Sequence, residues 1–109
     1  MTKYQKGYQF ELKVRKFLES KKECIFVFRS AGSKGPFDLI AFFKDKVYLI
    51  QCKYGYMPKK EAEELLRIEG DICNHFDCFE ILIAQPQKSG RSLKVLFQNL
   101  SGVEIGFPL

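Results

Sequence analysis

Four polar side chains interrupt otherwise apolar patterns, and their types are those of a phosphodiester-cleaving site. Asp38 opens an apolar strand, whereas Gln51 and Lys53 close the next one. Glu11 lies on the edge of the apolar stripe of a helix. Carboxylate and amide oxygens are hard ligands for Mg²⁺, which polarises a phosphate and acidifies a bound water. A nearby lysine stabilises the charge that develops during cleavage. The pattern therefore indicates metal-dependent hydrolysis.

Each of these residues also has an ordinary structural interpretation. A glutamate at the rim of a helix stripe can extend its head group to water, which explains Glu11 on periodicity alone. Asp38 follows a Gly-Pro pair and can cap a turn. Gln51 and Lys53 can mark a strand end that reaches solvent. The chemical interpretation requires that all four meet in one place.

The register of one hairpin decides whether they meet. Side chains alternate along a strand, so Gln51 and Lys53 point to one face. A two-residue turn at 44–45 places Asp38 opposite Gln51, and one at 45–46 places it opposite Lys53. Both turns unite the three side chains, whereas a three-residue turn puts Asp38 on the other face. We expect a two-residue turn, because it keeps the apolar residues of both strands on consistent sides.

The positioning elements follow from hydrophobic periodicity. A helix crossover between strands requires parallel neighbours and a hairpin requires antiparallel ones. We therefore expect an α/β fold, with an αβββαβ core plus one more strand forming a mixed central sheet flanked by helices. The predicted helices are 3–21 and 59–76, the strands are 24–30, 37–43, 47–53, 79–84 and 93–98, and the polar loops are 31–36 and 85–92.

Both helices carry apolar stripes that predict which side faces the core. The first helix places four apolar residues at 3.6-residue spacing, and the second places six toward the core, although Gly70 weakens it. These residues are Phe10, Val14, Phe17 and Leu18, then Ala62, Leu65, Leu66, Ile72, Cys73 and Phe76.

Composition limits the class of protein. The chain has 109 residues, which suits one domain over 1–109, and its eleven Phe and five Tyr exclude wholesale disorder. No apolar run approaches the roughly 20 residues of a membrane helix, and the first ten residues lack a signal-peptide core. We expect a cytoplasmic protein with no membrane partner and no small-molecule substrate. The net charge of +5 favours an anionic partner such as nucleic acid.

The cysteines and the single histidine point away from other chemistries. The four cysteines form no CxxC pair, and we expect reduced, mostly buried thiols. A zinc site from Cys73, His75 and Cys78 remains an alternative, although this spacing matches no common zinc finger. One histidine at a helix end argues against Ser/His/Asp or Cys/His catalysis.

Together, these motifs resemble the PD-(D/E)XK nuclease superfamily, which has the restriction-endonuclease-like fold, and within it the archaeal Holliday junction resolvases. The Asp and the x-x-Lys alone are weak signals, but the Arg-Ser-Ala-Gly-Ser run just before the Asp makes the combination fairly specific. The resemblance covers about residues 6–53, and the remainder only in element order. The runs that carry it are 6–11, 27–34, 38–41 and 49–53.

The resemblance implies a homodimer with two active sites that cleaves four-way DNA junctions on two opposing strands with Mg²⁺ or Mn²⁺. Glu11, Asp38 and Gln51 would match the metal ligands, and Lys53 the catalytic lysine. Arg29 would lie near the scissile phosphate. Two serines, Ser30 and Ser33, would lie in a loop that reaches the DNA backbone. The expected DNA-binding residues are Lys6, Lys13, Arg29, Ser33 and Lys34.

Two residues depart from the resolvase pattern. Gln51 stands where these enzymes usually carry glutamate, so the metal would be held more weakly. The Mrr-like branch of the superfamily is similar to this sequence at that position, with Gln-x-Lys. Leu12 stands where arginine is common, and Lys13 or Arg15 would substitute for it. The alternatives are therefore an Mrr-like or less specific DNA nuclease, or a catalytically weakened DNA-binding protein of the same fold.

The C-terminal segment 103–109 is too apolar to remain in water. It either packs on the core or forms part of a subunit interface, and we favour the interface.

Overall fold

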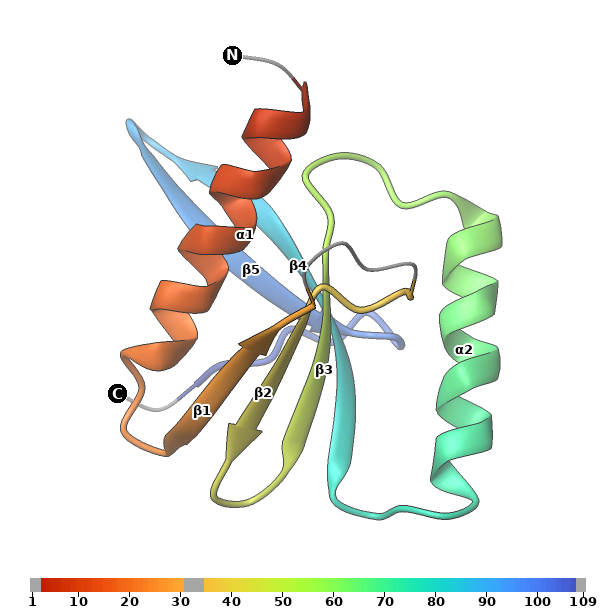
Figure 1. Cartoon of the computed structure of the whole chain (residues 1–109). Coiled ribbons are helices and arrows are strands. Elements are labelled where there is room, and N and C mark those ends of the chain that lie inside the picture. The colour runs from red at the N-terminus through yellow and green to blue at the C-terminus, as the bar shows by residue number, and fades with distance from the viewer. Residues whose placement is uncertain (1–2, 31–34, 108–109) are drawn as a thin grey trace.

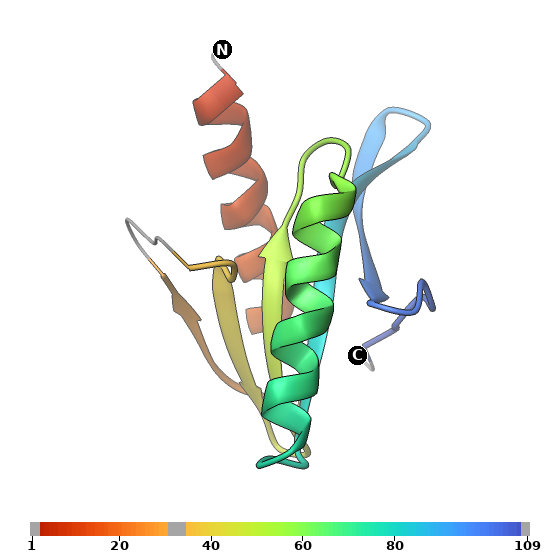
Figure 2. The same cartoon turned by 90° about the vertical axis from the view of Figure 1, so that its right-hand side faces the viewer.

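One five-stranded mixed sheet organises the chain, and a helix lies on each face of it (Figures 1 and 2). The computed structural model describes residues 3–30 and 35–107. The spatial order is β1-β2-β3-β4-β5, with β3 and β4 parallel and the other neighbours antiparallel. The predicted αβββαβ order with one more strand is confirmed. The elements are α1 Lys3–Glu19, β1 Cys24–Arg29, β2 Leu39–Phe43, β3 Val47–Cys52, α2 Lys59–Cys73, β4 Phe79–Ser89 and β5 Ser92–Asn99.

The β2–β3 hairpin has the two-residue turn that unites the candidate residues. Leu39 pairs with Ile50, and the pairing continues to the turn without a shift. The N–H of Phe43 donates to the carbonyl of Lys46 at 3.0 Å, which closes the turn around 44–45. Of the two turns expected, this is the one that places Asp38 opposite Gln51.

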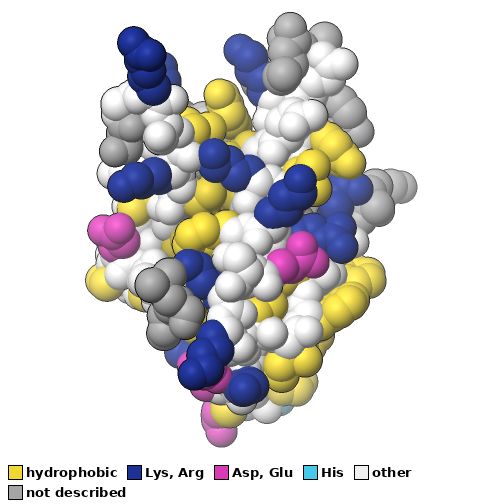
Figure 3. Space-filling model, turned by 90° about the vertical axis from the view of Figure 1, so that its left-hand side faces the viewer, with side chains coloured by type: hydrophobic (Ala, Val, Ile, Leu, Met, Phe, Trp, Pro, Cys, Tyr) yellow, Lys and Arg dark blue, Asp and Glu magenta, His cyan; other side chains and the backbone are white. Residues whose placement is uncertain are grey.

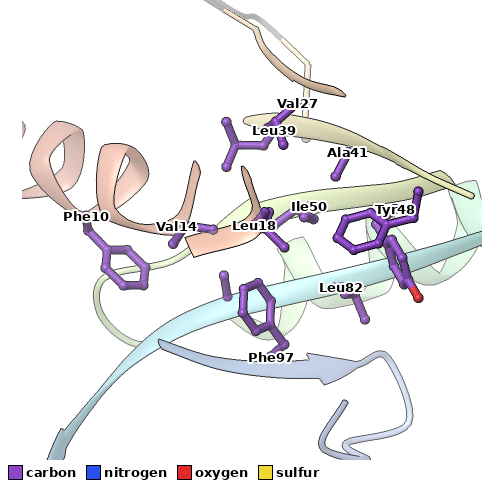
Figure 4. Close-up of a cluster of buried hydrophobic side chains, with 12 residues drawn as sticks. Phe10, Val14, Leu18, Val27, Leu39, Ala41, Tyr48, Ile50, Leu82 and Phe97 are labelled. Carbon is purple, nitrogen blue, oxygen red and sulfur yellow. The ribbon is translucent and has the colours of Figure 1, made fainter. Parts of the chain in front are cut away.

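The main core lies between α1 and the sheet (Figure 4). The predicted stripe of α1 is confirmed, because three of its residues are buried and Phe17 packs against them. Burying one such side chain stabilises the fold by about 1.5–3 kcal/mol, so α1 is fixed firmly. The buried cluster is Phe10, Val14, Leu18, Val27, Leu39, Ala41, Phe43, Tyr48, Ile50, Leu82, Ala84 and Phe97.

The second helix is buried much less than its stripe predicts. Leu65 is its buried residue, whereas Leu66 is 51% exposed and Cys73 is also exposed. Phe76 lies beyond the end of the helix and is 66% exposed. The prediction for these three residues is wrong. The physical reason is that α2 lies in front of β3 and β4 only (Figure 2), so the sheet cannot cover its whole apolar face.

Residues 85–92, predicted as a polar loop, instead belong to a two-stranded arm that spans residues 85–96. β4 pairs with β3 only as far as Ala84, and from Gln85 to Ser89 it pairs with β5 alone. Gly90, with φ of 63°, provides the left-handed turn conformation that favours glycine. The sequence lacks the apolar–polar alternation that indicates a strand, because an arm that extends into solvent carries polar side chains on both faces.

The C-terminal segment packs on the core, which corrects the expected subunit interface. The ring of Phe107 lies 5.0 Å from Phe97 and 5.1 Å from Tyr48, centre to centre. The N–H of Ile105 donates to the carbonyl of Phe97 at 2.8 Å, which fixes the path of the chain. The segment therefore packs against aromatic side chains of the same chain beneath α1. Residues 108–109 lie outside the described residues.

The cysteine expectation is only half correct. All four cysteines are free, but Cys73 and Cys78 are exposed. Cys73 is the last residue of α2, and Cys78 lies in the connection between α2 and β4. Cys24 and Cys52 are half-buried. Within residues 3–30 and 35–107, no helix is long and apolar enough to cross a membrane.

Candidate active site

Asp38 is held at the point where β2 begins and β3 ends. Its N–H donates to the carbonyl of Ile50 at 2.9 Å, and its carboxylate Oδ2 accepts the N–H of Cys52 at 2.8 Å. Its own carbonyl accepts the N–H of Ser30 at 3.0 Å. These bonds connect three neighbouring strands at a single residue. The position of the carboxylate is therefore set by the backbone.

Gln51 lies opposite Asp38 and has an unusual side chain. Its Oε1 atom is buried and has no hydrogen-bond partner among the described residues. Leaving a buried acceptor unpaired costs about 1–3 kcal/mol. A bound cation would satisfy this oxygen and remove the cost.

Lys53 is anchored at both its backbone and its head group. Its N–H donates to the carbonyl of Ala84 at 2.8 Å, so the hydrogen bonding to β4 continues one residue past the end of β3. Its Nζ lies 2.7 Å from the Oε2 of Glu61 on α2. The ion pair holds the ammonium group near the end of β3. Gln51 lies two residues before Lys53 in the sequence.

Glu11 is paired with Arg29 across the gap between α1 and β1. The Nε of Arg29 donates to the Oε1 of Glu11 at 3.0 Å, and both side chains are partly buried. The Arg29 guanidinium carbon also lies 4.9 Å from the ring centre of Tyr8. The carboxylate on the edge of the helix stripe is thus compensated by a cation from the neighbouring strand.

The electrostatics of Asp38 show how close these groups are. Burial is the largest influence and raises the pKa of Asp38, and the N–H of Cys52 opposes it. The charge of Glu11 also raises this pKa, while those of Lys53 and Arg29 lower it. Residues from α1, β1 and the end of β3 therefore act on one carboxylate.

The Cys52 thiol is not a candidate nucleophile. Burial is the main influence that raises the pKa of Cys52, and the charges of Asp38 and Glu11 raise it further. A cysteine reacts as its thiolate, so this side chain stays inert.

The donor set partly fits a magnesium ion. Mg²⁺ in nucleotide-processing sites is usually bound by one or two carboxylates, with water and substrate phosphate completing the shell. Asp38 supplies one carboxylate, and Gln51 supplies a buried amide oxygen without a partner in the described chain. Over those same residues, no three or more His, Cys, Asp or Glu side chains are grouped closely enough to hold a metal. The zinc alternative at Cys73, His75 and Cys78 therefore has no support from the geometry.

A pocket of about 410 Å³ opens beside Gln51, between the sheet and α2. Two glutamates and one lysine are among the side chains that line it. Its lining residues are Gly35, Pro36, Gln51, Lys60, Glu61, Glu64 and Leu65.

The remaining predicted residues are distributed around this centre. Ser30 is half-buried at the end of β1, and its backbone N–H bonds to Asp38. Lys6 and Lys13 are exposed on α1. Arg15, a possible substitute for the missing arginine, pairs instead with Glu19 at 3.4 Å on the same helix. Ser33 and Lys34 lie outside the described residues.

Glu61 is the residue that sequence reasoning missed. It lies in the first turn of α2, where an acidic residue is ordinary because it suits the helix dipole. Its spacing from Lys53 gave no signal, because the pair forms only when the chain turns back after Lys53. The acidic first turn of α2 was the only available clue.

Comparison with known proteins supports the fold. No family model matches the chain, and no curated protein matches it. A solved structure is similar: Hjc, a Holliday junction resolvase from the archaeal hyperthermophile Archaeoglobus fulgidus. The TM-score is 0.63 at 22% identity, over 88% of this chain and 74% of the other. This chain has the restriction-endonuclease-like α/β fold.

Asp38→Asn is expected to raise the free energy of unfolding at neutral pH. Burial raises the folded-state pKa of Asp38, so ionisation disfavours the folded state, and its stability falls as pH rises through that pKa. Asn keeps an oxygen for the Cys52 N–H without the charge. Urea unfolding in a chelating buffer should show a gain at pH 7 that disappears below the ordinary Asp pKa of about 3.9.

Asp38→Ala provides the contrast, because it also removes the acceptor of the Cys52 N–H. It should forfeit about 1–3 kcal/mol relative to the Asn variant. An Asn variant that is less stable than the wild type at both pH values would contradict the burial argument.

Proposed function

We propose that this protein is a metal-dependent DNA endonuclease that resolves four-way junctions by paired strand cleavage. One observation carries the proposal: Asp38, Gln51 and Lys53 converge where β2 and β3 meet, with the Gln51 oxygen buried and unpartnered in the described chain. The similarity in fold to a Holliday junction resolvase supports the choice of substrate.

The residues divide the work by their chemistry. Asp38 and Gln51 would hold Mg²⁺ or Mn²⁺, with Glu11 nearby as a third oxygen source. When bound, the ion supplies Lewis-acid activation of the phosphate and of a water molecule. Lys53 stabilises negative charge on the phosphate being cleaved. Glu61 keeps the Lys53 ammonium oriented before DNA arrives, through their 2.7 Å contact.

The basic residues would hold the DNA backbone around this centre. The net charge is +5, and Lys6 and Lys13 are exposed on the helix that also carries Glu11. Arg29 joins the site from β1 through its bond to Glu11. Together with Ser33 and Lys34, these residues would contact phosphates, which position a substrate without reading its sequence. Binding should therefore weaken steeply with salt.

The homodimer that paired cleavage requires has a suitable surface. α2 does not cover the outer face of β1 and β2, where Phe26 pairs with Phe42 and Phe28 with Ile40. Phe26 and Phe28 are 56% and 51% exposed. Contiguous exposed apolar surface of this kind marks interaction sites. A second copy on this face would bury the aromatic side chains and bring two active sites into one assembly.

A specific observation favours a second candidate, DNA binding without cleavage. Gln51 carries no charge, and the Glu11 carboxylate is already paired with Arg29. Among the described residues of the site, Asp38 is then the carboxylate without a salt bridge, and a single carboxylate attracts Mg²⁺ weakly. Binding of junctions without cutting would indicate this function.

Cleavage of a synthetic four-way junction beside a linear duplex of the same sequence separates these functions. With Mg²⁺ or Mn²⁺, paired nicks on the junction are expected, and Asp38→Asn should lower the rate by roughly 100-fold or more. Gln51→Glu should raise the rate, because it adds the missing charge. Equal cutting of both DNAs would indicate an Mrr-like nuclease, and no cutting by any variant would contradict hydrolysis.

Phe28→Asp tests the dimer surface. A charge at the centre of an apolar interface should weaken dimerisation by roughly 30-fold or more, the size of a hot-spot loss. Sedimentation of the wild type, the variant and a Tyr56→Asp control measures this. Tyr56 is 82% exposed and lies in the segment between β3 and α2, so its variant should remain dimeric. A wild type that is monomeric at all concentrations would refute the proposed surface.

A further inference from the structure

The β4–β5 arm and the N-terminal half of α1 extend beyond the same end of the sheet (Figures 1 and 2). A groove of about 290 Å³ lies between them. It is lined by two lysines and a glutamine of α1, two aromatic rings and one leucine of the arm. These residues are Lys6, Gln9, Phe10, Lys13, Tyr54 and Leu93.

The walls of this groove are basic. Lys6 and Lys13 line it from α1, and no acidic residue is among its described lining residues. The arm carries another lysine on the face that includes the lining residue Leu93, because Lys88 pairs directly with Leu93 and directly paired residues share a face. Figure 3 shows a notch between two projections, with Lys and Arg side chains on both and hydrophobic side chains within it. The groove thus suits a polyanion.

The floor of the groove is aromatic. Tyr54 is 48% exposed and its ring meets that of Phe10 edge to face at 6.0 Å. Phe10 itself is buried and supports the Tyr54 ring, while about half of Tyr54 remains exposed. An exposed aromatic ring between basic walls is the arrangement that binds single-stranded nucleic acid, because each unpaired base can stack on the ring while lysines contact its phosphates.

Two residues of the groove floor are sequence neighbours of candidate active-site residues. Phe10 precedes Glu11 and Tyr54 follows Lys53, so both floor residues are direct neighbours of site residues. Consecutive Cα atoms lie about 3.8 Å apart, so a strand in the groove lies near the backbone of Glu11 and of Lys53. In a duplex the faces of the bases are covered by their neighbours, so the Tyr54 ring gives a duplex no comparable contact.

We propose that this groove binds one unpaired DNA strand next to the active site, so that the preferred substrates are branched DNAs with a single-stranded segment. The inference rests on the proposed nuclease function for the identity of the nucleic acid. It goes beyond that function in two respects. It assigns the β4–β5 arm, Tyr54 and Lys88 to binding, and it predicts that a splayed branch is bound better than a fully paired one.

Fluorescence anisotropy with a labelled oligothymidylate of about 12 nucleotides tests the groove without any cleavage step. The wild type should bind the oligonucleotide in chelating buffer, and Tyr54→Ala should weaken binding by roughly tenfold through lost stacking. Tyr54→Phe keeps the ring and should bind as the wild type does. Tyr56→Ala, at an exposed tyrosine outside the groove, is the matched control.

Lys88→Ala and Lys94→Ala form a second matched pair, because both lysines are exposed on the arm but alternate to opposite faces. Lys88→Ala should reduce the slope of log K against log salt by about 0.7, the value for one phosphate contact on a single strand. Lys94→Ala should leave the slope unchanged. Both variants alter a solvent-exposed side chain, so their folding is not at issue.

The outcomes separate this inference from the proposed function. Unchanged binding by Tyr54→Ala, or equal losses from the two lysine variants, would overturn the groove even if the wild type cuts junctions. Binding that depends on Tyr54 and Lys88 would support the groove even if no DNA is cut. Tighter binding of the fully paired duplex than of the oligonucleotide would also contradict it.

Discussion

The hydrogen bond from the Cys52 N–H to the Asp38 carboxylate is the constraint on which the site depends. It joins the first residue before β2 to the last residue of β3 at 2.8 Å, and it forms because the intervening turn has two residues. One residue more in that turn would move Asp38 to the other face of the sheet. The buried core beneath α1 keeps this register in place, since Leu39 and Ile50 pair within it.

Charge compensation holds two of the charged side chains of the site in place. Two ion pairs, one between Glu11 and Arg29 and one between Lys53 and Glu61, each connect a helix to the sheet. Within each pair the two charges compensate each other. The buried oxygen of Gln51 has no hydrogen-bond partner in the described chain, and the Asp38 carboxylate beside it accepts the Cys52 N–H. A cation or a phosphate-bound metal would satisfy both, and this is the physical basis of the hydrolytic proposal.

The sequence predicted what depends on local patterns, and missed what depends on how elements cover one another. The alternation in β2 and β3 predicted that Asp38 and Gln51 would share a face of the sheet, and the spacing of Phe10, Val14 and Leu18 predicted the buried face of α1. The exposure of Leu66 could not be predicted in this way, because it follows from the narrow strip of sheet beneath α2. The arm beyond Ala84 and the pairing of Glu61 with Lys53 likewise exist only once the chain has folded.

The central claim is that Asp38 and Gln51 form a divalent-metal site, and Mn²⁺ binding measured by electron paramagnetic resonance tests it without any DNA. The account predicts that the wild type binds Mn²⁺, that Asp38→Asn weakens binding at least about tenfold, as loss of a charged oxygen ligand requires, and that Gln51→Glu strengthens it. Equal Mn²⁺ binding by the wild type and both variants would contradict the account.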